Sequence, residues 1–303
     1  MKKIKQLISA FAFITSFLAS AQSIQIITID GEEVSYKGLE KLASSDFSKL
    51  KEVRILNTSG NVMAIDDVLL KKILDNSTHL ESLEIKEIGI STFPEITSEN
   101  TTLKTLILRL NGLSKLPNTF GKFIGLETID LYNPISEVPD SFINLKRLEN
   151  LKFEGVELVE FPEQVFSFSN LKSLIISQFD TKNKIKSLPD MFDKLPLLEE
   201  LSVRNAALSE VPASVGRLPK LENVYFNANN LVKLPQSLAE NSHLTYVNIN
   251  NNPLDFKQFI KSIEKIQWKG VFYINNKNFS SAQYEEVEKR LPKISVFYTQ
   301  KDE

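Results

Sequence analysis

The chain repeats a unit of about 23 residues, and this repeat constrains the fold more than any other feature of the sequence. The clearest copy runs from Leu103 to Phe123 and fits the pattern L-x-x-L-x-L-x-x-N-x-L-x-x-L-P-x-x-F-x-x-F. A proline that follows an apolar residue recurs once in each copy, from Pro94 to Pro235. Because the leucine pattern and the proline step recur with the same spacing over so much of the chain, the sequence predicts a stack of similar units. The copies open at Leu80, Leu103, Leu126, Leu148, Leu171, Leu198, Leu221 and Leu244, with a looser copy at Leu50.

The first part of each unit has the period of a strand with one buried face. In the copy that opens at Leu198, we expect Leu201 and Val203 to point inward and Ser202 to point outward. One short strand cannot bury its apolar face alone, so neighbouring units must stack in parallel to complete a core. The proline fixes φ and donates no hydrogen bond, which favours an irregular outer segment over a long helix.

On these motifs, residues 50 to 256 resemble the leucine-rich-repeat family. The L-P step resembles the subclass found in Ras-suppressor-type, plant disease-resistance-type and many exported bacterial repeat proteins. The resemblance implies an α/β solenoid with a curved parallel sheet on its concave face and a capping unit at each end. We place an N-terminal cap and irregular first repeat at 22–79, the solenoid at 80–256 and a C-terminal cap at 257–303.

Two positions of the unit are expected to hold each turn and the back of the core. Asparagine after the strand can bond backbone groups that a tight bend leaves unpaired, and Asn111, Asn229 and Asn252 occupy that position. Other units carry Val156, Phe179 or Ala206 there, so we expect a broken ladder whose turns find other partners, such as water. A stacked apolar spine is expected behind the sheet, formed by Phe120, Phe142, Phe192, Val215 and Leu238.

The end units depart from the strict pattern, as an open stack requires. At the N-terminal end we expect strands around Ile24 and Val34, a helical stretch over 38–50 and a helix over 68–74. At the other end, 271–274 and 294–298 have the composition of strands. They flank a helix that Ser280 or Ser281 can cap and Leu291-Pro292 would end.

Residues 1–21 have the three parts of an export signal. Lysines at 2, 3 and 5 precede an apolar run over 7–18, and Ala19-Ser20-Ala21 offers small residues for cleavage before Gln22. The apolar run is shorter than the roughly 20 residues that span a bilayer. We expect a secreted or periplasmic protein with no membrane insertion once the signal is removed.

The charge and the rare residue types exclude several functions. Of the 36 Lys and Arg residues three lie in the signal, which leaves 33 against 38 Asp and Glu. This mildly acidic balance argues against nucleic acid as a partner. The absence of cysteine excludes disulfides, thiolate metal ligands and thiol nucleophiles.

No catalytic group of residues is apparent in the sequence. The two histidines, His79 and His243, lie seven units apart and cannot meet. There is no glycine-rich phosphate loop and no clustered metal-ligand motif, and the acidic residues are expected to be solvated surface charges. We therefore expect no enzymatic activity, no cofactor and no bound metal.

Outward strand positions have no role in the core, so parallel stacking gathers them into one surface that can be shaped for a ligand. The middle units carry a patch of mixed charge, and Arg204 in the unit that opens at Leu198 is a further charged candidate. The later units carry an uncharged surface rich in tyrosine and asparagine. The first consists of Arg109, Asp130, Tyr132, Lys152 and Glu154. The second consists of Tyr225, Tyr246, Asn223, Asn227, Asn248 and Asn250.

The sequence predicts an exported, monomeric protein that binds a protein partner through its concave face. A glycan-binding or adhesion protein that uses the tyrosine and asparagine surface is the alternative. An ordinary solvated sheet face also fits both patches, because exposed strand positions are usually polar. The extra residues at 180–184 are either a binding loop or a tolerated bulge.

Overall fold

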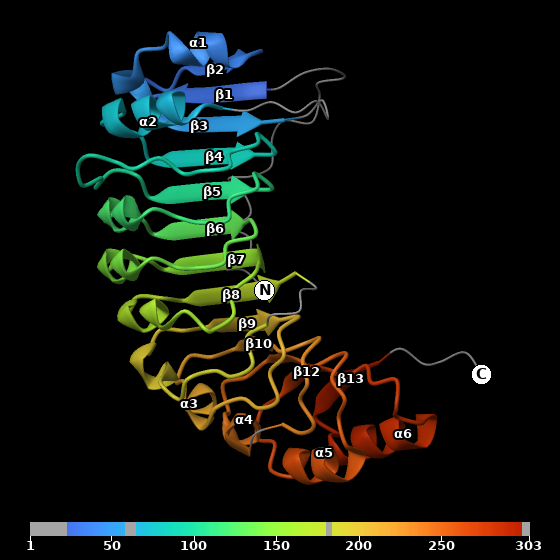
Figure 1. Cartoon of the computed structure of the whole chain (residues 1–303). Helices are drawn as coiled ribbons and strands as arrows, with labels where there is room; N and C mark the ends of the chain where they lie inside the picture. The colour runs from blue at the N-terminus through green and yellow to red at the C-terminus, as the bar shows by residue number, and fades with distance from the viewer. Residues whose placement is uncertain (1–22, 58–64, 180–183, 235, 299–303) are drawn as a thin grey trace.

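The computed structural model describes residues 23–57, 65–179, 184–234 and 236–298. Within these ranges the strands form a single sheet in the order β13-β12-β11-β10-β9-β8-β7-β6-β5-β4-β3-β1-β2. From β3 to β13 every pairing is parallel, and β1 pairs antiparallel with both β2 and β3. Figure 1 shows the strands stacked along one side, the short helices along the other, and the last strands bending away from the line of the first. The chain is therefore a curved α/β solenoid.

The strands are short and follow the repeat. They are β1 (Ser23–Thr28), β2 (Glu33–Tyr36), β3 (Leu50–Leu56), β4 (Ser82–Lys86), β5 (Thr105–Arg109), β6 (Thr128–Tyr132), β7 (Asn150–Val156), β8 (Ser173–Gln178), β9 (Glu200–Arg204), β10 (Asn223–Tyr225), β11 (Tyr246–Asn248), β12 (Gly270–Tyr273) and β13 (Ile294–Phe297).

The outer side carries α-helices and single 3-10 turns, labelled η. They are α1 (Leu39–Ala43), η1 (Phe47–Lys49), α2 (Asp67–Asn76), η2 (Asn118–Lys122), η3 (Asp140–Asn144), η4 (Glu163–Ser167), η5 (Phe192–Lys194), α3 (Ala213–Gly216), α4 (Gln236–Glu240), α5 (Phe256–Ile263) and α6 (Ser281–Arg290).

The core lies between the sheet and this outer row of turns, as the repeat predicts. Leu201 and Val203 are fully buried on β9, and the five residues of the expected spine are also fully buried. Ser202 differs from the expectation: it lies on the outward face but is only 2% exposed. Its neighbours in register are Ile175 on β8 and Tyr225 on β10, two large side chains beside a small one.

Buried side-chain amides hold the turns after the strands. Asn111 donates to the Ile85 carbonyl (2.9 Å) and accepts from the Ile88 amide (3.1 Å), both in the preceding unit. Asn229 and Asn252 make the same kind of bonds one unit back. Each side chain thereby satisfies backbone groups that water cannot reach.

The amide ladder continues where the sequence suggested a break. Asn133 donates to the Leu108 carbonyl at 2.7 Å, and Gln178 donates to the Leu158 carbonyl at 2.6 Å. The register between β7 and β8 shifts after Glu154, which pairs Val156 with Gln178. The predicted break is therefore wrong at Phe179, where the Gln178 amide one residue earlier replaces the asparagine, and at Ala206, where Asn205 donates to the Gln178 carbonyl at 2.8 Å. At Val156 the position carries no amide side chain, as predicted.

The end units agree in outline with the sequence. α6 begins at a capping box formed by Ser280 and Gln283, and α2 includes the helix predicted over 68–74. The helical stretch predicted over 38–50 is instead divided into α1 and η1. The hydroxyl groups of Ser44 and Ser45 both donate to the Lys41 carbonyl, and Asp46 accepts from the Ser48 amide, so side chains compete with the helix for backbone partners.

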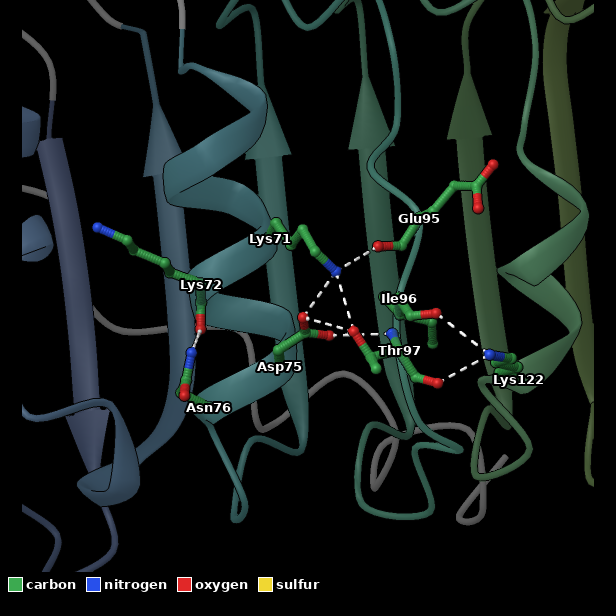
Figure 2. Close-up of polar contacts among 8 residues, drawn as sticks. All are labelled: Lys71, Lys72, Asp75, Asn76, Glu95, Ile96, Thr97 and Lys122. Atoms are coloured by element: carbon green, nitrogen blue, oxygen red, sulfur yellow. Dashed lines mark hydrogen bonds and ion pairs between the residues drawn. The ribbon is translucent and has the colours of Figure 1, made fainter.

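Polar contacts join α2 to the connection that precedes β5 (Figure 2). The Lys71 amine donates to the Asp75 carboxylate and to the Glu95 carbonyl, both at 2.7 Å. Asp75 in turn accepts from the backbone amide and the hydroxyl group of Thr97. Burial opposes ionisation of Asp75, but the hydrogen bonds from Lys71 and Thr97 outweigh it and lower the pKa of this carboxyl. These contacts fix the irregular first unit to the regular stack.

Candidate binding surface

Five charged side chains on the sheet face form a continuous series of ion pairs, which we call the ion-pair chain: Arg109, Asp130, Lys152, Glu154 and Arg204. Arg109 makes a two-pronged contact with Asp130, using its Nε and Nη2 atoms. Lys152 lies 4.0 Å from Asp130 and 2.8 Å from Glu154. The Arg204 Nη2 atom reaches across β8 to Glu154 at 3.0 Å. Positive and negative groups therefore alternate over β5 to β9.

The ion-pair chain is partly covered, which strengthens its contacts relative to fully exposed pairs. The Asp130 side chain is 11% exposed, although the sequence suggested an outward group free for a ligand. Its hydrogen bond to Arg109 raises the pKa of that guanidinium, against the opposing effect of burial. Asp130 therefore organises its neighbours more than it faces solvent.

Four aromatic rings form a second feature of the sheet face, the aromatic column: Tyr225, Tyr246, Tyr273 and Phe297. The centroids of Tyr225 and Tyr246 are 4.9 Å apart, and those of Tyr246 and Tyr273 are 5.3 Å apart. Tyr273 stacks on Phe297 at 5.0 Å with an interplanar angle of 16°. The column crosses β10 to β13, so aromatic contacts replace ion pairs in this part of the sheet.

The structure brings together the two tyrosines that the sequence singled out and adds two rings that it missed. Tyr273 and Phe297 lie beyond the strict repeat, so the strand register of the repeat could not be used to assign them to a face. The alternation of Val271, Tyr273 and buried Phe272 was the signal that could have placed Tyr273 on the outer face. Burial raises the pKa of Tyr225 and of Tyr246, so both hydroxyl groups remain protonated at neutral pH.

The asparagines beside the aromatic column divide into two kinds. The Asn248 side chain accepts from the Asn250 amide at 3.0 Å, and the Asn250 side chain accepts from the Asn275 amide. These two asparagines help to hold the ends of the strands. Asn223 and Asn227 are half-buried, and no residue in the described ranges bonds their side-chain amides. They are the better candidates for contact with a ligand.

Tyr132 has a different environment from the other residues of the central patch. Its ring lies 6.0 Å from that of Phe179, centroid to centroid, over the end of β7. Gly155 lies beneath them with φ of +63°, and a Cβ there would come within 2.6 Å of both rings. Phe179 is 37% exposed, so the pair forms an apolar contact beside the ion-pair chain. Residues 180–183 of the predicted loop lie outside the described residues.

No group of three or more His, Cys, Asp and Glu side chains in the described residues is arranged to hold a metal ion. No helix there is long and apolar enough to cross a bilayer. The proposed signal at 1–21 lies outside the described residues.

No family model matches the sequence, and no curated protein matches it either. Solved structures match well, among them a leucine-rich-repeat protein of Leptospira interrogans with a TM-score of 0.59 and 19% identity. That match covers 82% of this chain and 72% of the other.

Two further matches come from proteins of different origin. An internalin of Listeria monocytogenes has a TM-score of 0.54 and 18% identity, covering 89% of this chain and 77% of that one. The ectodomain of the plant receptor kinase GASSHO1/SCHENGEN3 of Arabidopsis thaliana, solved with Casparian strip integrity factor 2, has a TM-score of 0.61 and 21% identity. The match covers 85% of this chain but 31% of the ectodomain. The chain therefore has the leucine-rich-repeat fold.

Proposed function

We propose that the protein binds a polypeptide partner along its sheet face, with the aromatic column as the main contact. The observation that carries the proposal is the uninterrupted series of four aromatic rings beside polar amides on strands without charged residues. Tyrosine supplies large contact area at low entropic cost, and its hydroxyl group can bond a partner's backbone. The structural match to a receptor ectodomain solved with its ligand supports this use of the fold.

The geometry of the column favours a polypeptide over a stacked sugar. A sugar ring that stacks on an aromatic residue needs a free ring face. In the column Tyr246 and Tyr273 each have a ring on both sides, within 5.3 Å. Their edges and hydroxyl groups remain for contact, which suits backbone and side-chain groups of an extended chain. A glycan-binding or adhesion protein is the second candidate, supported by the outer face of Phe297, which is 46% exposed.

The proposal is tested by replacing two rings of the column. Tyr225→Ala with Tyr246→Ala is expected to lower affinity for a partner captured from an extracellular or envelope extract by at least about tenfold, because two interface tyrosines are lost. The melting temperature should remain within a few degrees of the parent, since both side chains are half-buried on the outer face. Tyr36→Ala on β2, far from the column, serves as the control.

Two outcomes would count against the proposal. If the double variant binds the partner as the parent does, the column is not the contact surface. If the parent binds on a glycan array and captures no protein, the adhesion function replaces the one proposed here.

Export through a cleaved signal and a monomeric state are part of the same proposal. Expression of the full chain in a bacterium, with recovery of periplasm and medium, should give a protein whose first residue is Gln22. Light scattering coupled to size-exclusion chromatography should give the mass of a single mature chain. A retained N-terminus at Met1 would contradict export by this route.

A further inference from the structure

On β9 the ion-pair chain ends at Arg204, a positive group with one carboxylate partner among the described residues. Asp130 contacts both Arg109 and Lys152, and Glu154 contacts both Lys152 and Arg204. Three cations thus share two carboxylates. Arg204, the last member, keeps a side chain that is 34% exposed.

Two polar atoms at this end are buried without partners. The Arg204 Nε atom and the Ser202 hydroxyl group, two residues apart on β9, make no hydrogen bond within the described residues and are closed to solvent. Unpaired buried donors are costly, and in native proteins they are uncommon. Ser202 is 2% exposed, and it lies on the same face of β9 as Arg204. Because these two donors cannot be reached from solvent, only the exposed part of the Arg204 side chain is open to a further partner.

The next strand supplies no carboxylate to continue the alternation. Tyr225 on β10 is in register with Ser202, and the backbone carbonyl of Asn227 accepts from the Asn205 amide, which places Asn227 beside Arg204. Glu200 is the one acidic residue of β9, and it accepts from the Ser173 hydroxyl group on β8. The place where a third carboxylate would stand is occupied by neutral groups.

We propose that the exposed part of the Arg204 guanidinium, with Asn227 beside it, receives the side-chain carboxylate of an Asp or Glu residue of a polypeptide partner. The apolar residues that flank this acid then lie along the aromatic column. The inference rests on the proposed function and specifies the chemistry of its ligand. Glu154 accepts one bond from the Arg204 Nη2 atom, and the planar guanidinium has further N–H groups that can donate to a second carboxylate. One acidic residue followed by an uncharged apolar stretch is the ligand that matches both parts of the surface.

A display library of random peptides, selected on immobilised mature protein, tests the inference. Peptides selected on the parent should share an acid at one fixed position next to aromatic or aliphatic residues. Selection on Arg204→Gln should retain the apolar residues and lose the acid. Arg217→Gln is the matched control, because it also removes an arginine–carboxylate pair, with Asp193, on the outer side of the solenoid. Its peptides should resemble those of the parent.

Affinities of one selected peptide and of its Glu→Gln form complete the test. The parent should prefer the acidic form by about tenfold, as loss of one charge-assisted hydrogen-bonded pair implies, and Arg204→Gln should bind both forms equally. A melting curve of Arg204→Gln close to that of the parent excludes misfolding.

The outcomes separate the two proposals. If the parent selects apolar peptides without an acid, or if Arg204→Gln keeps the preference for the acid, the inference is wrong and the proposed function stands. If no peptide is selected on the parent while a glycan array is positive, both are overturned.

Discussion

The strands before and after the boundary between β9 and β10 have the same buried face but different outer faces. Except for β8, each strand from β3 to β9 contains at least one charged residue, whereas β10 to β13 contain none. The first group holds its outer side chains together with ion pairs, and the second does so with stacked rings. The inner positions are aliphatic or aromatic in both groups.

The core and the chemistry of the outer surface are therefore separable in a repeat of this kind. The inward residues determine that units stack, and they do so equally on both sides of the boundary. The outward residues contribute little to stacking and can differ from unit to unit. A ligand that lies across the boundary would therefore meet a charged half and an uncharged half within one continuous surface.

We expect the largest effect on stability from a charge placed in the core, which is alike in both groups of strands. Leu201→Asp on β9 and Val247→Asp on β11 should each lower the free energy of unfolding by several kcal/mol, about 3 or more, because an unpaired carboxylate is buried. Denaturant unfolding monitored by circular dichroism gives the values. Similar losses for both variants would show that the two groups of strands share one kind of core. A parent-like curve for either variant would show that the substituted residue does not face the core.

A smaller effect is expected where two rings meet in the charged half. Gly155→Ala should cost about 1–3 kcal/mol, because the new methyl group displaces the Tyr132 and Phe179 rings and the residue keeps a positive φ. Gly112→Ala is the control, since Gly112 also has a positive φ but open space around it. The difference between the two variants, measured by chemical denaturation, isolates the ring contact. Equal losses would show that the contact adds nothing.

The ion-pair chain should contribute modestly and in a salt-dependent way. Glu154→Gln removes the negative charge from the pairs with Lys152 and Arg204 and should cost about 1 kcal/mol at low ionic strength. The loss should shrink in high salt, whereas Asn227→Ala in the uncharged half should show no such dependence. Thermal melts across a salt series measure both. A salt-independent loss for Glu154→Gln would mean that packing, and not charge, distinguishes the two halves.

We expect the smallest effect on stability in the irregular first unit, at the N-terminal end of the charged half. Asp75→Asn should cost about 0.5 kcal/mol at neutral pH, in the range of an i,i+4 pair, because it removes the ion pair with Lys71. The folded-state pKa of Asp75 is lowered, so its contribution is present above the unfolded value of about 3.9 and is lost as pH falls through the folded value. The stability gap between parent and variant should therefore close below about pH 4. A gap that persists in acid would exclude ionisation as its cause.

The inner half of the fold could be predicted from the sequence because one rule repeats. Leu201 and Val203 are buried as the alternation requires, and the proline-linked spine is buried behind them. The rule was less reliable at the turns after the strands. In the longer unit that opens at Leu171, Gln178 bonds the Leu158 carbonyl and the Ile185 amide in place of an asparagine at 179, and the repeat does not specify this substitution.

The outer surface was predicted as a set of residues but not as a set of contacts. Residues such as Arg109 and Tyr225 were assigned to the correct face, because strand alternation decides the face. Their partners depend on side-chain reach between strands, as in the contact from Arg204 to Glu154, which passes over an intervening strand. Asp130 was expected to be open to a ligand and is instead enclosed by two cations, which only the three-dimensional arrangement reveals.

The buried amides of the turns also have a direction. Asn111, Asn133, Asn229 and Asn252 each bond backbone groups of the unit before their own, and Asn276 bonds the Leu254 carbonyl in the same sense. In these cases the turn of one unit is completed by the unit that follows it. As the ribosome releases the chain from its N-terminus, each of these turns lacks its amide partner until the following unit has emerged and folded onto it. Shortening the protein from its C-terminus would in the same way leave an open turn at each new end.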